Sequence, residues 1–252
     1  MDLFGHTRSR IAANHALVTP DTHVWGPLPG WKSATAAVHI SPHLGARFMQ
    51  TSVALEAGGM SGGAADGMER VIFVRSGAVS IKLPGGGPAQ RLGAEGFAYF
   101  PADRPHEIKA TEPTNLVVFE KPFTKAPGVE LPEAVVGAAA DVPGEPFMGD
   151  EAARLQVLLP TDERYDLAMN LFTYQPGATL PQVEIHVMEH GLIMLDGAGV
   201  YRLGNSWYPV EAGDVIWMGS YCPQWFVAMG KTPARYLYYK DVNRNPLAVS
   251  TS

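Results

Sequence analysis

The segment from Glu184 to His190 carries the side chains best suited to chemistry. It reads Glu-Ile-His-Val-Met-Glu-His, and Gln224 follows it one hairpin downstream. If the segment is extended, successive side chains point to opposite faces. Glu184, His186 and His190 then share one face, and the intervening Ile and Val side chains share the other. A carboxylate and two imidazoles on one strand face are costly to bury without a partner, so we expect this face to bind a metal ion.

A helix is the alternative reading of the same residues. The run from His186 to His190 matches the H-x-x-E-H pattern of a zinc peptidase helix, in which the histidines bind metal and the glutamate acts as a base. Pro181 and Gly191 bound the run and leave about nine residues, which is short for an isolated helix. The sequence that follows is strand-like and punctuated by glycines. We therefore expect an extended segment.

The composition favours a β-rich globular protein. The chain has 252 residues, enough for one large β domain or two of ordinary size, and 46% of them are hydrophobic. The 27 glycines and 21 prolines provide many turns. The formal charge is −6 and no basic run is present, so we expect no nucleic-acid partner.

The expected location is the cytoplasm. No apolar stretch reaches the roughly 18 residues that a membrane span needs, and the N-terminus lacks the apolar region of a secretory signal. Cys222 is the single cysteine, which excludes an internal disulfide and fits a reducing compartment.

Two stretches of the chain share one pattern at an offset of about 120 residues. The run from Val71 to Lys82 corresponds to the run from Leu192 to Leu203, and the copies end in similar strands at 116–121 and 236–240. Short strands separated by glycine turns indicate a β-sandwich or jelly-roll barrel, although two generic hairpins could also agree by chance. We expect an all-β protein with an N-terminal barrel and arm at 1–123, a linker at 124–146 and a C-terminal barrel at 147–252.

The spacing around the candidate ligands resembles the two-part cupin signature. Gly197 follows His190 at the expected distance, and Gly213 opens a second part that ends at Gln224. Glu184 stands at the first histidine position, His190 at the glutamate position and Gln224 at the last histidine position. This altered set resembles the ureidoglycine aminohydrolase family, whose members are bicupins, with two jelly-roll barrels in tandem.

The resemblance implies an enzyme of allantoin and purine catabolism. It would be a manganese-dependent hydrolase that releases ammonia from (S)-ureidoglycine and leaves (S)-ureidoglycolate. Glu184, His186, His190 and Gln224 would be the metal ligands. Such a mixed oxygen and nitrogen set suits Mn²⁺ or Fe²⁺ better than Cu⁺, and Zn²⁺ is also chemically possible. By analogy with other bicupins we expect a homo-oligomer.

The last strand supplies further candidates. Tyr236, Tyr238 and Lys240 share one face by the period of two, and the resemblance implies that Tyr201, Tyr236 and Lys240 face the metal cavity. We expect Lys240 to bind the substrate carboxylate or to handle a proton, and we assign catalysis to Lys240 and Glu184. Substrate contacts are assigned to Tyr201, Gln224, Tyr236 and Lys240. The tyrosines could equally be wall residues, and Gln224 could be a hydrogen-bonded loop amide.

The first copy differs at the matching positions. Ala64, Asp66 and Arg70 stand where the second copy has its ligands, and only His106 fills the last ligand position. We expect this barrel to be metal-free and structural. The competing functions are a metal-dependent bicupin oxygenase or decarboxylase, and a cupin that binds an effector without catalysis.

Overall fold

Strands make up nearly all the regular structure of the protein. The computed structural model describes residues 6–85 and 87–245, and this part holds strands β1 to β20 and three 3-10 turns, Pro20–Thr22, Pro42–Leu44 and Ala139–Asp141. The prediction of an all-β protein is confirmed. Residues 1–5 of the arm, Gly86 in the first glycine-rich turn and 246–252 lie outside the described residues.

The chain divides into two compact units. The first barrel is Val24–Val142, and the second barrel combines Met1–His23 with Pro143–Ser252. These bounds differ from the expected ones in two respects. The N-terminal arm groups with the second barrel, and the segment expected to be a linker, 124–146, is shared between the units.

The first barrel is built on one branched sheet. Its strands run in the order β11-β8-β5-β10-β4-β9-β6-β7, and β3 pairs with β4. Their bounds are β3 (Trp31–Ile40), β4 (Met49–Ser61), β5 (Met68–Ser76), β6 (Val79–Lys82), β7 (Gln90–Leu92), β8 (Gly96–Phe100), β9 (Glu107–Ala110), β10 (Thr114–Pro122) and β11 (Val135–Ala138).

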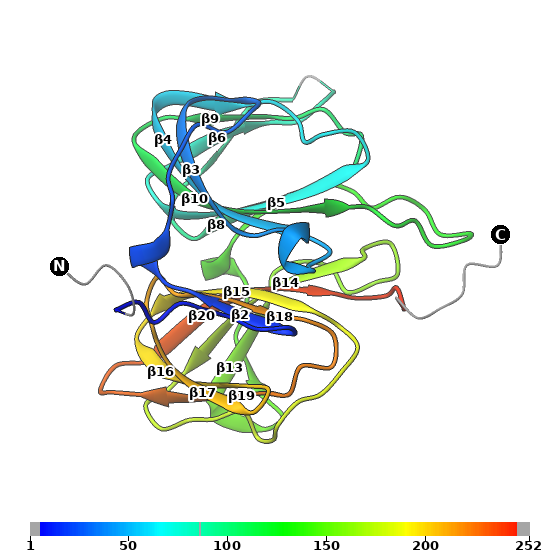
Figure 1. The fold of residues 1–252 in the computed structure, drawn as a ribbon. Coiled ribbons are helices and arrows are strands. Elements are labelled where there is room, and N and C mark those ends of the chain that lie inside the picture. Colours follow the sequence, from blue (N-terminus) through cyan, green and yellow to red (C-terminus); the bar gives the residue numbers. More distant parts are fainter. Residues whose placement is uncertain (1–5, 86, 246–252) are drawn as a thin grey trace. The chain divides into compact units, whose positions relative to one another are not determined.

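The second barrel has two sheets that face each other across its core (Figure 1). One runs β1-β2-β18-β15-β20-β14-β13-β12 and the other β17-β16-β19. The bounds are β1 (Arg10–Ile11), β2 (His15–Val18), β12 (Glu145–Phe147), β13 (Asp150–Val157), β14 (Leu167–Tyr174), β15 (His190–Asp196), β16 (Ala198–Leu203), β17 (Ser206–Glu211), β18 (Val215–Met218), β19 (Gln224–Met229) and β20 (Ala234–Asp241).

The two barrels repeat one strand order, which confirms the repeat seen in the sequence. The order β8-β5-β10-β4 in the first barrel matches β18-β15-β20-β14 in the second. The strands at the next edge come from different places in the chain, because β11 covers β8 and β2 covers β18. An uncovered edge would expose a row of unpaired backbone groups. The linker segment covers this edge in the first barrel, and the N-terminal arm covers it in the second.

Side chains fix the arm to the second barrel. Arg8 forms a bidentate ion pair with Asp214, with donor–acceptor distances of 2.6 and 2.9 Å. His15 Nε2 pairs with the hydroxyl of Tyr208 at 2.9 Å. These contacts explain why the arm belongs to the second unit.

Matching glycines turn the chain between the central strands of each barrel. Gly77 follows β5 with φ 80°, and Gly197 follows β15 with φ 70°. A Cβ at Gly77 would lie 2.3 Å from the carbonyl oxygen of Pro113, and one at Gly197 would lie 2.4 Å from that of Pro233. Both positions therefore require glycine for conformation and for space.

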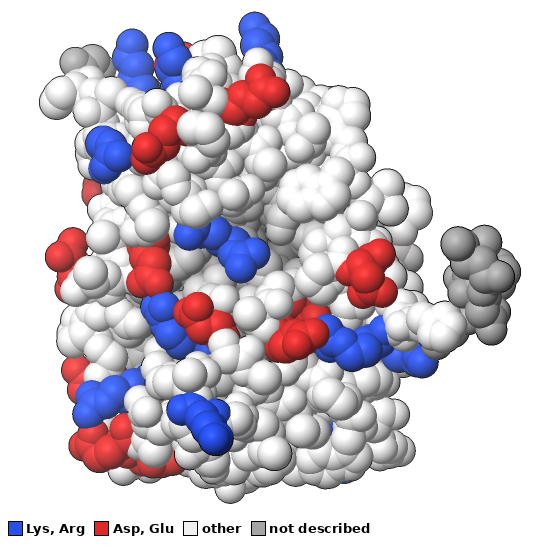
Figure 2. All heavy atoms as spheres, turned by 90° about the vertical axis from the view of Figure 1, so that its left-hand side faces the viewer, with Lys and Arg blue, Asp and Glu red and all other residues white. Residues whose placement is uncertain are grey.

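Charged side chains of both signs are interspersed on the face drawn in Figure 2. No helix in the described part of the chain is long and apolar enough to cross a membrane.

Candidate active site

The ligand segment is neither the expected strand nor a helix. Glu184 forms a single antiparallel bridge with Gln224, in which each backbone N–H donates to the other residue's carbonyl oxygen at 2.9 and 3.0 Å. The chain then runs without regular structure until β15 begins at His190. The apolar face expected for this segment is not buried, since Ile185 is 60% exposed. The expectation of a continuous strand was therefore wrong, because before β15 begins at His190 only Glu184 forms a β-bridge.

The bridge brings Glu184, His186 and Gln224 together. The Glu184 carboxylate lies 3.9 Å from His186 Nε2, and the Gln224 side-chain nitrogen lies 3.0 Å from the same atom. His186 Nδ1–H donates to the carbonyl oxygen of Met188 at 3.0 Å. This bond fixes the tautomer, so Nε2 carries a lone pair that points toward the other candidate ligands.

His190 joins this group from β15. Its ring stacks on the ring of His186, with centroids 4.9 Å apart, and on that of Tyr238, at 5.3 Å. On the neighbouring strand β20, Lys240 lies directly opposite His190 in the ladder. The strand pairing thus places an ammonium group beside the imidazole.

A cavity of about 70 Å³ lies among these residues. Six expected site residues line it: Glu184, His190, Tyr201, Gln224, Tyr236 and Lys240. Tyr238 lines it too. His186 reaches the group through its contacts with Gln224 and His190 and is not part of the cavity wall.

Sequence reasoning missed the apolar part of this cavity. Phe147, Phe172 and Leu180 complete its wall. Behind it lies Tyr174, whose hydroxyl pairs with that of Tyr236 at 3.1 Å. The period of two along β14 puts Phe172 and Tyr174 on one face, but only the pairing of β14 with β20 shows that this face meets the site.

Burial dominates the electrostatics of the site. It lowers the pKa of His190 well below the usual value, and the nearby His186 and Lys240 lower it further. Burial is also the main cause that lowers the pKa of His186. Burial also lowers the pKa of Lys240, against the opposing effect of Glu184. The hydroxyls of Tyr201 and Tyr236 have raised pKa values because both are buried, so they remain neutral donors.

Two buried polar atoms of the site lack hydrogen-bond partners within the described residues. They are His190 Nε2 and Gln224 Oε1. Buried polar atoms normally have a partner, so an imidazole nitrogen and an amide oxygen left without one at the same cavity fit a bound cation. No three His, Cys, Asp or Glu side chains of the described chain are already arranged as a metal site. The donor types therefore fit, while their present arrangement is not a closed coordination sphere.

In the first barrel a guanidinium occupies the corresponding place. Arg70 Nε and Nη2 both lie within 2.9 Å of Glu120 Oε1, and Nη1 donates to the carbonyl oxygen of Gly62 at 2.8 Å and to His106 Nε2 at 3.2 Å. Arg70 and Glu120 are largely buried. This barrel therefore presents a neutralised cation where the second presents candidate ligands. The absence of a metal ion from the first barrel remains a prediction.

Two nearby residues lie outside the group of candidate site residues. Cys222 is buried, and burial raises the pKa of its thiol, so it is poorly suited to act as a nucleophile. Glu189, just before β15, is buried and accepts a hydrogen bond from the Trp217 indole at 3.2 Å.

The fold and the site together define a bicupin. Residues 170–239 match the family model of the cupin domain. A solved structure of oxalate decarboxylase from Bacillus subtilis aligns with a TM-score of 0.71 at 12% identity, over 90% of this chain and 77% of the other. At that identity the likeness shows the fold alone.

Closer relatives identify the family within this class. An (S)-ureidoglycine aminohydrolase of Arabidopsis thaliana is 41% identical over 251 residues, which cover 98% of this chain and 82% of the plant protein. The structure of a glyoxylate-induced protein from Pseudomonas aeruginosa aligns with a TM-score of 0.89 at 31% identity, over 100% of this chain and 96% of the other. The chain belongs to the (S)-ureidoglycine aminohydrolase family.

Proposed function

We propose that the protein hydrolyses (S)-ureidoglycine, releasing ammonia and leaving (S)-ureidoglycolate. The observation that carries the proposal is the 41% identity to a named aminohydrolase over nearly the whole chain. The side chains around the cavity support it, because they combine candidate ligands of mixed type with an ammonium group and three phenols. The oxygenase, decarboxylase and effector-binding alternatives are not favoured.

Glu184, His186, His190 and Gln224 would hold a divalent cation, which we propose to be Mn²⁺. The two atoms without partners, His190 Nε2 and Gln224 Oε1, provide one nitrogen and one oxygen donor. The lone pair of His186 Nε2 and the Glu184 carboxylate provide the others. A cation bound there would supply Lewis acidity to a coordinated oxygen or nitrogen of the substrate.

The substrate carries a carboxylate, an amine and a ureido group on one carbon. Hydrolysis breaks the bond from this carbon to the amine and forms a bond to oxygen, with water supplying the oxygen and the proton that ammonia takes away. Lys240 would bind the substrate carboxylate. Because burial lowers its pKa, Lys240 can also give up a proton more readily than an exposed lysine can.

The phenols of Tyr201 and Tyr236 would orient the ureido group. Both line the cavity, and both hydroxyls stay protonated, so each can donate a hydrogen bond to the ureido carbonyl. Donors held rigidly in a dry cavity bind a carbonyl more strongly than water does. A cytoplasmic location and a homo-oligomeric state complete the proposal.

The direct test is ammonia release from freshly prepared (S)-ureidoglycine by the full-length protein, after chelation and again after addition of Mn²⁺. Allantoate is assayed in parallel. Ureidoglycine decomposes unaided, so this background release of ammonia is subtracted. We expect release above background that depends on ureidoglycine and on added Mn²⁺. Release no faster than the unaided decomposition would overturn the proposed function.

A further inference from the structure

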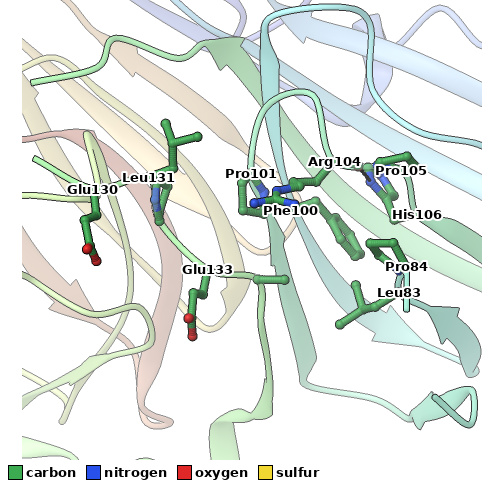
Figure 3. A pocket seen from close by; sticks show the side chains of 12 residues that line it. Leu83, Pro84, Phe100, Pro101, Arg104, Pro105, His106, Glu130, Leu131 and Glu133 are labelled. Carbon is green, nitrogen blue, oxygen red and sulfur yellow. Dashed lines mark hydrogen bonds between the residues drawn. The ribbon is translucent and has the colours of Figure 1, made fainter. Parts of the chain in front are cut away.

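The first barrel contains a cavity far larger than the one described above. Its volume is about 460 Å³, compared with about 70 Å³ in the second barrel. Figure 3 shows that one wall comes from the end of β8 and the loop after it, and that the segment 130–134 faces this wall. The volume lies within the roughly 300–1,000 Å³ range of small-molecule sites.

The walls of this cavity are rigid and mainly apolar. Leu83, Phe100 and Leu131 contribute hydrocarbon or aromatic surface. Four prolines also line the cavity: Pro84, Pro101, Pro105 and Pro132. Proline has no backbone N–H, so these positions offer a ligand no main-chain donor. A bound molecule must therefore have an apolar body.

His106 lines the cavity but has no hydrogen-bonding capacity left for a ligand. Its Nδ1–H donates to the carbonyl oxygen of Arg104 at 3.0 Å, and its Nε2 accepts from Arg70 at 3.2 Å. The ring stacks on Phe100, with centroids 3.8 Å apart and planes 7° apart. His106 and Phe100 thus form a fixed aromatic wall.

Charged side chains line the cavity on two opposing elements. Arg104 belongs to the loop after β8, and in Figure 3 its side chain extends toward Pro101. Its guanidinium pairs with no other side chain of the described residues, and it is the lining side chain able to donate to a carboxylate. Glu130 and Glu133 lie on the facing segment, and their carboxylates can only accept.

We propose that this cavity binds a small zwitterion with an apolar body, such as an α-amino acid with an aromatic or branched side chain. The ligand carboxylate pairs with Arg104, and the ligand ammonium pairs with Glu130. The apolar body lies against Phe100, Leu83 and the prolines. A purely anionic ligand would meet the two glutamates, and a purely cationic one would meet Arg104, so the distribution of charge favours a ligand that carries both.

The test is calorimetric titration of the full-length protein with four probes. L-Phenylalanine has both charges and an apolar body, phenylacetate lacks the ammonium, phenethylamine lacks the carboxylate, and glycine lacks the apolar body. We expect phenylalanine to bind at least tenfold more tightly than each of the others. Arg104→Gln and Glu130→Gln should each weaken its binding at least tenfold. Lys109→Gln, which removes an exposed cation of the same barrel outside the cavity, should leave binding unchanged.

A fourth variant shows which barrel binds the ligand. Glu184→Gln alters the cavity of the second barrel and should not change the affinity for phenylalanine. The proposal is overturned if phenylalanine does not bind, if phenylacetate or phenethylamine binds equally well, if Arg104→Gln has no effect, or if Glu184→Gln abolishes binding.

Discussion

His190 and Lys240 lie directly opposite each other on β15 and β20. The first barrel keeps the same register with different residues, since Arg70 on β5 lies opposite Glu120 on β10. One scaffold thus holds two kinds of polar pair at one position. In the first barrel the pair is a closed ion pair, whereas in the second it leaves His190 Nε2 without a hydrogen-bond partner among the described residues.

Loss of the Lys240 ammonium should slow turnover strongly without loss of the metal. We expect Lys240→Met to lower kcat for (S)-ureidoglycine by about 100-fold or more, the size of effect usual for a group that handles a proton or positions a reacting charge. Metal content and thermal stability should stay close to those of the wild type. Lys231→Met, at an exposed position before β20, is the matched control. Full turnover in Lys240→Met would remove Lys240 from the mechanism.

Tyr174 should influence catalysis through Tyr236. Tyr174→Phe keeps the ring packed against Phe172 and removes only the hydroxyl that pairs with Tyr236. We expect KM to rise up to about tenfold, as loss of one neutral hydrogen bond allows, while metal content is unchanged. Tyr221→Phe, at a tyrosine that is 51% exposed, should have no effect. Equal KM values for all three proteins would show that this hydroxyl pair does not position Tyr236.

The ion pair of the first barrel should be needed for stability because each partner is buried. Arg70→Met leaves Glu120 as a buried charge without its partner, so we expect a loss of about 3–5 kcal/mol in the free energy of unfolding. The double variant Arg70→Met with Glu120→Met should be more stable than the single variant, because no charge then remains to be desolvated. Calorimetric unfolding measures both, and a double variant less stable than the single one would contradict this account.

His106 should make stability depend on pH. Burial, aided by the charge of Arg70, lowers the pKa of His106 to about 4, compared with 6.5 for a free histidine. Between pH 6.5 and 4 the unfolded chain binds a proton at His106 and the folded chain does not, so stability falls as the pH falls through this range. At the acid end of this range the free energy of unfolding should be lower by about 3 kcal/mol. In His106→Gln this part of the pH dependence should disappear, and an unchanged slope would contradict the burial of a neutral imidazole.

Periodicity and spacing were sufficient to predict the barrels and most of the residues that line the cavity of the second barrel. Glycines such as Gly77 and Gly197 mark the same turn in both copies, because each turn needs a positive φ and lacks room for a Cβ. The face shared by Tyr236 and Lys240 followed from the period of two along β20. Such features are local in the sequence, so the sequence predicts them.

Features that depend on pairing between distant segments were not predictable. β2 gives no sign in the sequence that it pairs with β18 rather than with the barrel that follows it. The segment from Glu184 to His190 alternates like a strand, but before β15 begins at His190 it forms only the bridge between Glu184 and Gln224. Phe172 and Tyr174 reach the site only because β14 lies beside β20.

Manganese binding tests the central claim most directly. Stripped full-length protein is titrated with Mn²⁺, and the loss of the free-ion signal is followed by electron paramagnetic resonance. We predict one tightly bound ion per chain, at least tenfold weaker binding in Glu184→Ala and His190→Ala, and unchanged binding in His43→Ala, which alters an exposed histidine of the first barrel. A wild-type protein that binds no Mn²⁺, or a His190→Ala variant that binds it as tightly as the wild type, would contradict the account.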